Sequence, residues 1–354
     1  MRDLVVALFT PPPPSRDATG ADHAIGAELE LIPVSSAPKR RVGINSAAGQ
    51  IGTAEIIRDF ALERGWREVA DAYGAPGWEL TGGGRISYEP GGKIEISSPV
   101  CNSADELISF LYQAIEPLRT VAAASGIDLL AVGVDPYNSI DQVLTQFRAP
   151  RYDNMARHFE RIGPAGVRMM RQTASLQINV ELGAMPLERW RLLNSIAPYL
   201  TAAFANSRMY AGEDTGHPSH RALIWQQLDP SRTGLPYNAA HPIDAYASFA
   251  EGATRILSDD AAHLSTLFPE VRPRGYFELR SIDAVELDRA AQAIRFVAAL
   301  TTSERATQEA LQLLGEPDAS RLYIAATVGR SDPAIDSRIR ELERIAGVSI
   351  SEKL

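Results

Sequence analysis

The sequence predicts an α+β fold, in which helices flank a mostly antiparallel, curved sheet. The first observation is that four short stretches alternate aliphatic side chains with carboxylates, amides or arginines, so each would form a strand with one apolar and one polar face. These stretches are residues 28–31, 93–96, 176–179 and 277–280. Such alternation is typical of antiparallel sheets. The second observation is that long amphipathic helices separate the strands in no regular βαβ order, which disfavours a parallel sheet.

Composition narrows the class of protein. The chain has 354 residues, of which 45% are hydrophobic and 22% charged, as in ordinary globular proteins. Its formal net charge of −9 argues against a nucleic-acid binder. No apolar run is long enough to span a bilayer. The single cysteine, Cys101, excludes an internal disulfide and a Cys-rich zinc site. We therefore expect a cytoplasmic protein that acts on small molecules.

The elements of the first half follow from local patterns. Residues 4–9 are apolar and predict a first strand or a disordered tail, and the prolines that follow predict an extended connector over residues 10–24. Ser103, with Glu106 three positions later, predicts the start of a helix that runs to residue 125. The other elements expected here are a strand at 25–33, a helix at 54–64, a hairpin arm at 88–97 and a strand at 127–135.

In the second half, two long amphipathic helices are expected at residues 186–205 and 287–314. No internal repeat and no linker interrupts the middle of the chain. We therefore predict one catalytic domain at residues 25–354, preceded by an N-terminal strand and Pro-rich connector at residues 1–24.

Glutamates dominate the polar faces of the predicted strands. Glu28 and Glu30 project from the same side of their strand. Glu89 and Glu95 flank the Pro90-Gly91-Gly92 turn, which could fold both carboxylates toward one place. Carboxylates are preferred ligands of Mg²⁺, and crowded like charges repel each other unless a cation neutralises them. Each pair alone could be an ordinary solvent-facing charge; together these segments indicate a metal–nucleotide site.

Arginines supply the complementary charge. Glu278 and Arg280 share a strand face and could form a surface ion pair of little energetic weight. They could instead place a metal ligand beside a cation that stabilises a transferring phosphoryl group. The planar guanidinium fork suits carboxylate and phosphate oxygens. Further candidates are Arg171, which we expect at the start of the strand with Gln177 and Asn179, and four arginines in loop-like surroundings: Arg221, Arg232, Arg272 and Arg274.

Two other kinds of site are disfavoured. The chain has no GxxxxGK[ST] loop, and its triple glycine at residues 82–84 precedes a predicted strand rather than a helix. It therefore lacks the helix N-terminus on which phosphate loops depend. Cys101 has no partner base nearby in the sequence, which disfavours a nucleophilic role.

Five segments, in order, resemble the plant-type glutamate–cysteine ligase family. They are RISYEPGGKIEISSP (85–99), which resembles the family's EPGGQ-type signature, GVRMMRQTASLQINVEL (166–182), FANSR (204–208), RALIWQQLDPSRTG (221–234) and HLSTLFPEVRPRGYFELRSIDA (263–284). The resemblance extends from residue 26 to residue 284. It is closest to the bacterial branch that supplies γ-glutamylcysteine for ergothioneine synthesis.

The resemblance implies a glutamine-synthetase-like catalytic fold and an ATP-dependent ligase. Such enzymes transfer the γ-phosphoryl group of ATP to the side-chain carboxylate of glutamate, and the amine of cysteine then displaces phosphate. The carboxylates implied to hold Mg²⁺ are Glu28, Glu30, Glu89, Glu95 and Glu278. Arg280 is implied to lie near the transferring phosphate. We assign the nucleotide to Gln177, Asn179 and Arg274, and the amino-acid substrate to Arg171, Arg221 and Trp225.

Two departures from the family pattern are visible. Residues 235–262 are shorter than the matching stretch of family members, and the first Glu-x-Glu strand follows the Pro-rich run closely, without a leader domain. Because the short stretch could belong to the amino-acid site, the acceptor amine stays open. The alternatives are a related ligase that joins glutamate or another amino acid to a different amine, and a non-catalytic relative that binds nucleotide or amino acid.

Overall fold

The long strand β1 is the centre of an antiparallel sheet of nine strands. A computed structural model describes residues 1–10, 24–47, 49–70, 74–146 and 149–350. The strand order is β12-β13-β7-β1-β5-β4-β3-β2, and β6 pairs with the C-terminal half of β1. The strands are β1 (Ile25–Ser35), β2 (Arg67–Ala70), β3 (Pro76–Glu79), β4 (Arg85–Glu89), β5 (Lys93–Ser97), β6 (Ile127–Leu130), β7 (Ser175–Glu181), β12 (Val271–Pro273) and β13 (Tyr276–Asp283). The predicted α+β architecture is confirmed.

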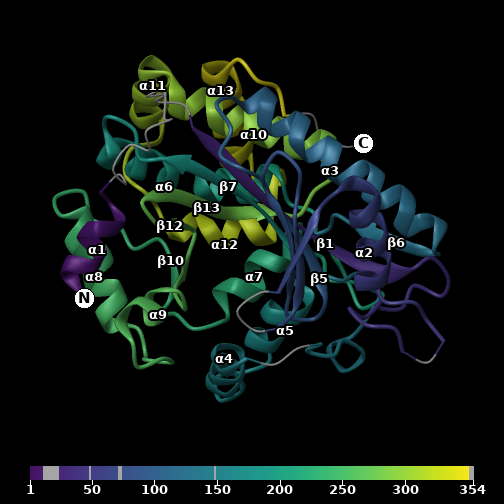
Figure 1. Ribbon diagram of the computed structural model, residues 1–354. Coiled ribbons are helices and arrows are strands. Elements are labelled where there is room, and N and C mark those ends of the chain that lie inside the picture. Colours follow the sequence, from purple (N-terminus) through teal and green to yellow (C-terminus); the bar gives the residue numbers. More distant parts are fainter. Residues whose placement is uncertain (11–23, 48, 71–73, 147–148, 351–354) are drawn as a thin grey trace.

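Helices cover both faces of this sheet. Figure 1 shows α10, α11 and α13 on one side, and α4, α5, α7 and α9 on the other. The helices are α1 (Arg2–Leu8), α2 (Thr53–Arg64), α3 (Ala104–Ala124), α4 (Pro150–Glu160), α5 (Ala165–Gln172), α6 (Pro186–Ala203), α7 (His220–Gln226), α8 (Pro242–Gly252), α9 (Asp260–Leu264), α10 (Leu287–Thr302), α11 (Glu304–Leu314), α12 (Ser320–Thr327) and α13 (Pro333–Ala346). The remaining regular structure of the described residues is two short two-stranded sheets, β8–β9 (Met209–Tyr210, Glu213–Asp214) and β10–β11 (Thr233–Gly234, Phe268–Pro269), and two 3-10 helices, η1 (Ile140–Gln142) and η2 (Gly329–Ser331).

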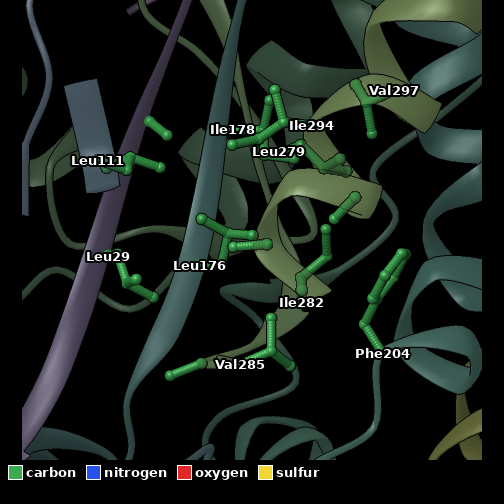
Figure 2. Close-up of a cluster of buried hydrophobic side chains, with 14 of the residues drawn as sticks. Leu29, Leu111, Leu176, Ile178, Phe204, Leu279, Ile282, Val285, Ile294 and Val297 are labelled. Atoms are coloured by element: carbon green, nitrogen blue, oxygen red, sulfur yellow. The ribbon is translucent and has the colours of Figure 1, made fainter. Parts of the chain in front are cut away.

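The aliphatic residues of the alternating strands form the main core. Leu29, Leu176 and Leu279 are fully buried on the same side of the sheet, where α3 and α10 supply Leu111 and Ile294. Figure 2 shows these side chains pointing toward one another from the sheet and from the helices. Burial of large aliphatic side chains is the main driving force for folding. The polar residues between them therefore face the opposite side, beneath α4, α5, α7 and α9.

Several predicted elements are confirmed. The helix that begins at Ser103 is α3, and the Ser103 hydroxyl accepts a hydrogen bond from the Glu106 N–H at 3.1 Å. The first strand, the helix at 53–64 and the helix at 186–203 lie where expected. The hairpin is formed by β4 and β5, with Glu89 opposite Lys93.

Four expectations are wrong. Residues 4–8 belong to helix α1, and Phe9 is its C-cap, so the run forms neither a strand nor a disordered tail. A six-residue apolar run has no period that separates helix from strand. The helix expected at 287–314 is two helices, since Ser303 adopts an extended conformation and caps α11 through the Ala306 N–H. The strand expected at 127–135 ends at Leu130. Arg171 lies in the last turn of α5 rather than at the start of a strand.

Other expectations stay untested. The connector predicted over residues 10–24 falls almost entirely on residues 11–23, outside the described residues. The division into residues 1–24 and one domain at 25–354 stays a prediction. Among the helices that the structure describes, none combines the length and apolarity that a bilayer crossing needs.

The turn of the β4–β5 hairpin provides a test of the fold. Gly91 has a φ of +86°, and a Cβ there would lie 2.4 Å from the carbonyl oxygen of Arg171. Gly82 has nearly the same φ, +87°, but a Cβ there would meet nothing within 4 Å. We expect Gly82→Ala to cost about 1 kcal/mol of unfolding free energy through backbone strain, and Gly91→Ala about 2 kcal/mol more through the clash.

Urea unfolding of both variants measures this difference directly. The pair is matched for backbone strain, so the difference isolates the close approach of α5 to the turn. Equal losses in the two variants would contradict the contact between Gly91 and Arg171.

Candidate functional site

A cavity of about 720 Å³ lies over the polar face of the sheet. Five strands, β1, β4, β5, β7 and β13, contribute carboxylate, amide and cationic side chains to its floor, and helices on this side contribute its walls. The floor residues are Glu28, Glu30, Glu89, Lys93, Glu95, Gln177 and Arg280. Segments that are far apart in the sequence, and that were singled out for their polar faces, therefore converge on one cavity.

Strand register places the carboxylates next to one another. Glu30 lies directly opposite Glu95, Glu28 lies opposite Gln177, and Glu89 lies opposite Lys93. Like charges directly opposite each other on one sheet face are destabilising. The sheet tolerates the arrangement only where a cation compensates it or where carboxylates retain their protons.

Glu30 is compensated by a cation of the protein itself. Lys93 Nζ donates to Glu30 Oε1 at 2.9 Å, and the Ser175 N–H and hydroxyl donate to Oε2 at 2.7 and 2.9 Å. Burial alone would raise the pKa of Glu30, but the Lys93 ammonium and these hydrogen bonds hold it below its ordinary value. Glu30 is thus a buried, ionised and fully paired carboxylate.

Glu28, Glu89 and Glu95 differ from Glu30 in this respect. Within the described part of the chain, no lysine or arginine lies within 4.0 Å of their carboxylate oxygens. Burial, reinforced by Glu28 and Glu89, raises the pKa of Glu95 well above its ordinary value. Burial also raises the pKa of Glu28, with Glu278 adding to the effect, and raises that of Glu89 to about 6. These three carboxylates are crowded and lack a close cation.

Glu278 is surrounded by arginines. It is fully buried and accepts from Arg272 at 2.7 Å, from Arg274 at 2.9 Å and from Arg280. Burial would raise the pKa of Glu278, but the guanidinium groups of Arg272 and Arg280 hold it well below its ordinary value. Three guanidinium groups already occupy its oxygens, so Glu278 organises the arginines of the cavity, and all three of them line it.

Arg280 is aimed by an irregularity in the sheet. The register of β13 against β7 shifts between Leu279 and Ile282, and bulges of this kind re-aim side chains. Arg280 Nη1 donates to Gln177 Oε1 at 2.5 Å. Its guanidinium carbon also lies 5.4 Å from the centre of the Trp225 ring, a cation–π distance. Hydrogen bonding and stacking together restrict the Arg280 guanidinium to one orientation.

Arg221 supports Arg280 from behind. It is almost fully buried, its Nη2 donates to the Arg280 carbonyl oxygen at 2.8 Å, and its guanidinium lies 5.4 Å from the same Trp225 ring. Trp225 lines the cavity, whereas Arg221 does not. The geometry makes Arg221 a positioning residue rather than a group exposed to substrate.

Two further candidates lie away from the cavity. Arg171 lines a separate cavity of about 360 Å³, and its Nη1 donates to the Val143 carbonyl oxygen at 3.1 Å. Asn179 is on the polar sheet face opposite Glu278 but does not line the cavity, and its Oδ1 has no partner among the described residues. The structure therefore brings neither side chain to the crowded carboxylates.

Sequence reasoning assigned no role to two residues that the site uses: Lys93 and Ser175. Lys93 is two positions from Glu95, and Ser175 two positions from Gln177, so the same alternation would have placed both on the polar face. Arg272 was a candidate for carboxylate or phosphate binding without an assigned partner. The pairing of β12 with β13, which sets Arg272 opposite Glu278, supplies that partner.

The wall above the carboxylates is apolar. A hydrophobic cluster separate from the main core contributes Tyr152, Met155, Met169, Met170 and Phe268 to the cavity. Arg151 of α4 donates to the Ser265 carbonyl oxygen at 2.8 Å, which ties this helix to the end of α9. A charged floor beneath an apolar wall suits a ligand with anionic and apolar parts.

The donor set fits a divalent cation with incomplete protein coordination. Among the described residues, no three Asp, Glu, His or Cys side chains are close enough together to enclose a metal ion by themselves. Mg²⁺ is usually held by one or two carboxylates, with water and phosphate oxygens completing its shell. Glu28, Glu89 and Glu95 are suited to this role, whereas Glu30 and Glu278 are already paired.

Comparisons with known proteins identify similar sequences. Residues 24–335 match the model of glutamate–cysteine ligase family 2. The glutamate–cysteine ligase EgtA of Mycobacterium tuberculosis is 27% identical over 89% of this chain and 83% of that protein. The EgtA of Mycolicibacterium smegmatis is 30% identical over 75% of this chain and 70% of that protein.

A solved structure shares the fold. The crystal structure of a glutamate–cysteine ligase from Francisella tularensis in complex with AMP aligns with a TM-score of 0.50 at 12% identity. The alignment covers 91% of this chain and 78% of that one. At such low identity the likeness concerns the fold alone, and it supports the glutamine-synthetase-like architecture.

Glu89→Gln tests the crowding of the carboxylates. The pKa of Glu89 is about 6, above its ordinary value of 4.5, so the folded state binds this proton more tightly than the unfolded chain does. Stability from this group is therefore present below pH 4.5 and is lost as the pH rises through 6. Glutamine does not titrate. The unfolding free energy of the variant, relative to that of the wild type, should therefore rise by roughly 1–2 kcal/mol from pH 4.5 to about pH 7.5.

The measurement is urea unfolding at both pH values in the presence of a chelator. Glu63→Gln, at an exposed carboxylate, is the matched control and should show no such pH-dependent gain. If the unfolding free energy rose by the same amount in both variants, the pH dependence could not be attributed to crowding of the buried carboxylates.

Proposed function

The chain belongs to glutamate–cysteine ligase family 2, and we propose that it is an ATP-dependent ligase that forms γ-glutamylcysteine. The γ-phosphoryl group of ATP transfers to the side-chain carboxylate of glutamate, giving ADP and an acyl phosphate. The amine of cysteine then attacks the acyl carbon and forms the C–N bond. The bond between the acyl carbon and the phosphate oxygen breaks, phosphate leaves, and the nitrogen loses a proton. We also propose a cytoplasmic location and a role in ergothioneine synthesis, as the sequence resemblance suggests.

One observation carries the proposal: crowded carboxylates and an arginine cluster share the floor of one cavity. Phosphoryl transfer needs chiefly charge neutralisation and alignment of the reacting oxygens. Arg280, fixed by Gln177 and Trp225, is suited to stabilise the charge of the transferring group. Gln177 lines the same cavity and is proposed to face the nucleotide or the reacting carboxylate. Arg274, which the sequence assigned to the nucleotide, lines the cavity at its β12–β13 end and is proposed instead to face an amino-acid substrate.

We propose that Glu28, Glu89 and Glu95 hold Mg²⁺. Bound there, Mg²⁺ would neutralise phosphate charge and orient the transferring group. The three carboxylates supply the negative charge that such an ion needs, and no lysine or arginine of the described residues lies within 4.0 Å of them. Glu30 contributes indirectly, since its pairing with Lys93 keeps one further negative charge from the cluster. Glu278 contributes by holding Arg272, Arg274 and Arg280 in place.

A second candidate function is a ligase of the same chemistry with a different amine. Residues 235–262, which are shorter than expected for the family, include helix α8 and most of helix α9. Tyr246 and Ala261 of these helices line the cavity, together with Leu264 at the end of α9. A segment that departs from the family pattern thus contributes to the substrate wall, and this observation keeps the acceptor amine open.

Phosphate release by purified protein with ATP, Mg²⁺ and glutamate, across a panel of amines, tests the proposal. We expect turnover that depends on cysteine, with equal amounts of ADP, phosphate and γ-glutamylcysteine. Preference for another amine would support the second candidate. Binding of ATP and glutamate without turnover would identify a non-catalytic relative and overturn the proposed function.

Glu95→Gln tests the metal assignment. In the wild type, Mg²⁺ should raise the thermal unfolding temperature, because it neutralises the crowded carboxylates and binds only the folded state. The variant should lose most of this stabilisation, and its turnover should fall roughly 100-fold or more. Glu63→Gln again serves as the control and should keep the wild-type response. An unchanged Mg²⁺ response in Glu95→Gln would remove Glu95 from the metal site.

A further inference from the structure

Helix α1 contributes to the wall of the cavity although it lies outside the residues that the family model matches. That match begins at residue 24, whereas Leu4, Ala7 and Leu8 of α1 line the cavity. The side chains are spaced i, i+3 and i+4, so they share one face of the helix. An element outside the family's matched segment thus supplies three neighbouring apolar side chains to the candidate active site.

The opposite face of α1 anchors it to the protein. Val5 and Phe9 are buried, and the Phe9 ring packs edge-on against Trp190 of α6 with ring centres 5.1 Å apart. Arg2 Nε donates to Asp244 of α8 at 2.8 Å. Figure 1 shows α1 lying beside α8. These contacts, with packing of Leu8 against the main core, account for the position of the helix without using Leu4 or Ala7.

The cavity-facing side chains are left for another partner. Leu4 is 40% exposed, and Ala7 is also exposed, whereas Leu8 is half-buried and packs partly against the main core. Core packing therefore does not account for Leu4 and Ala7. Because they border the cavity rather than the outer surface alone, a bound small molecule could cover them.

The charges beside α1 indicate what kind of small molecule would bind there. The Leu8 carbonyl oxygen accepts from the Gly275 N–H at 2.8 Å, so α1 is joined to the turn that follows Arg274. Among the described residues, Glu278 is the one direct ion-pair partner of Arg272, Arg274 and Arg280. Three guanidinium groups against one carboxylate leave two positive charges. With Glu28 also counted as ionised, these three arginines still exceed the two carboxylates by one charge.

We propose that α1 forms one wall of an amino-acid subsite. In this subsite the α-carboxylate of an amino-acid substrate binds Arg272 and Arg274, and its short aliphatic portion packs against Leu4, Ala7 and Leu8. The inference rests on the proposed function, in which both glutamate and cysteine have this chemistry. It makes α1 a determinant of substrate specificity that the family-matched segment does not contain.

Ala7→Phe tests the inference, because a phenyl ring at this position would occupy the proposed subsite. Overfilling a packed contact of this kind is expected to raise the KM of one amino acid about tenfold or more. The KM of ATP should change by less than about twofold, since the crowded carboxylates lie on β1, β4 and β5, away from the α1 end. Varying glutamate and cysteine separately identifies which of the two occupies the subsite.

The matched control is Asp3→Phe, which adds the same ring to an exposed position of α1 that does not line the cavity. It should leave all three KM values near wild type. Ala7→Leu is a smaller change that guards against misfolding of the phenylalanine variant, and it should shift the same KM in the same direction. Circular dichroism and thermal unfolding establish that each variant is folded.

The outcomes separate the two proposals. Suppose that the wild type forms γ-glutamylcysteine, so that the proposed function stands. The role proposed for α1 is then wrong if Ala7→Phe has the same KM values as Asp3→Phe, or if it changes only the KM of ATP. If the wild type shows no turnover, the proposed function fails first. Calorimetric titration with glutamate and with cysteine then decides the role of α1, since weaker binding in Ala7→Phe alone supports it and equal binding overturns it.

Discussion

The repulsion between carboxylates on neighbouring strands is the constraint on which the rest of this structure depends. Glu30 and Glu95 are set directly opposite each other, and Glu28 and Glu89 lie on the same face. A sheet built this way is stable only if each negative charge has a partner or keeps a proton. Lys93 and Ser175 satisfy Glu30, and three arginines satisfy Glu278. The three remaining carboxylates keep raised pKa values, which is the state that a divalent cation would relieve.

The two ends of the cavity consequently have opposite character. Toward β4 and β5 the floor is rich in carboxylates, and toward β12 and β13 it is rich in guanidinium groups. A ligase of this family must bring a nucleotide with its metal and an amino acid with its carboxylate into one space. Under the proposed function, a floor divided by charge would hold the two kinds of ligand apart until the reacting groups met near Arg280.

Supporting contacts matter as much as the groups that face the cavity. The bulge in β13 aims Arg280, Trp225 stacks against its guanidinium, and Arg221 holds its carbonyl oxygen from behind. Gly91 allows the turn between Glu89 and Lys93 to approach the backbone of α5. Helix α1 is joined to the turn after Arg274 and closes the guanidinium end. Each contact links an element of secondary structure to the position of one charge.

The sequence by itself determined which residues share the polar face, because side chains in a strand alternate with a strict period of two. That rule placed Glu28, Glu30, Glu95, Gln177 and Glu278 together, and local capping chemistry located the helix that begins at Ser103. Tertiary structure alone decided which of these carboxylates are neutralised, because pairing with Lys93 or Arg272 depends on strand register and not on sequence spacing. It likewise decided that residues 2–8 form a helix and that Arg171 lies apart from the cavity, since short segments take their conformation and contacts from the surfaces against which they pack.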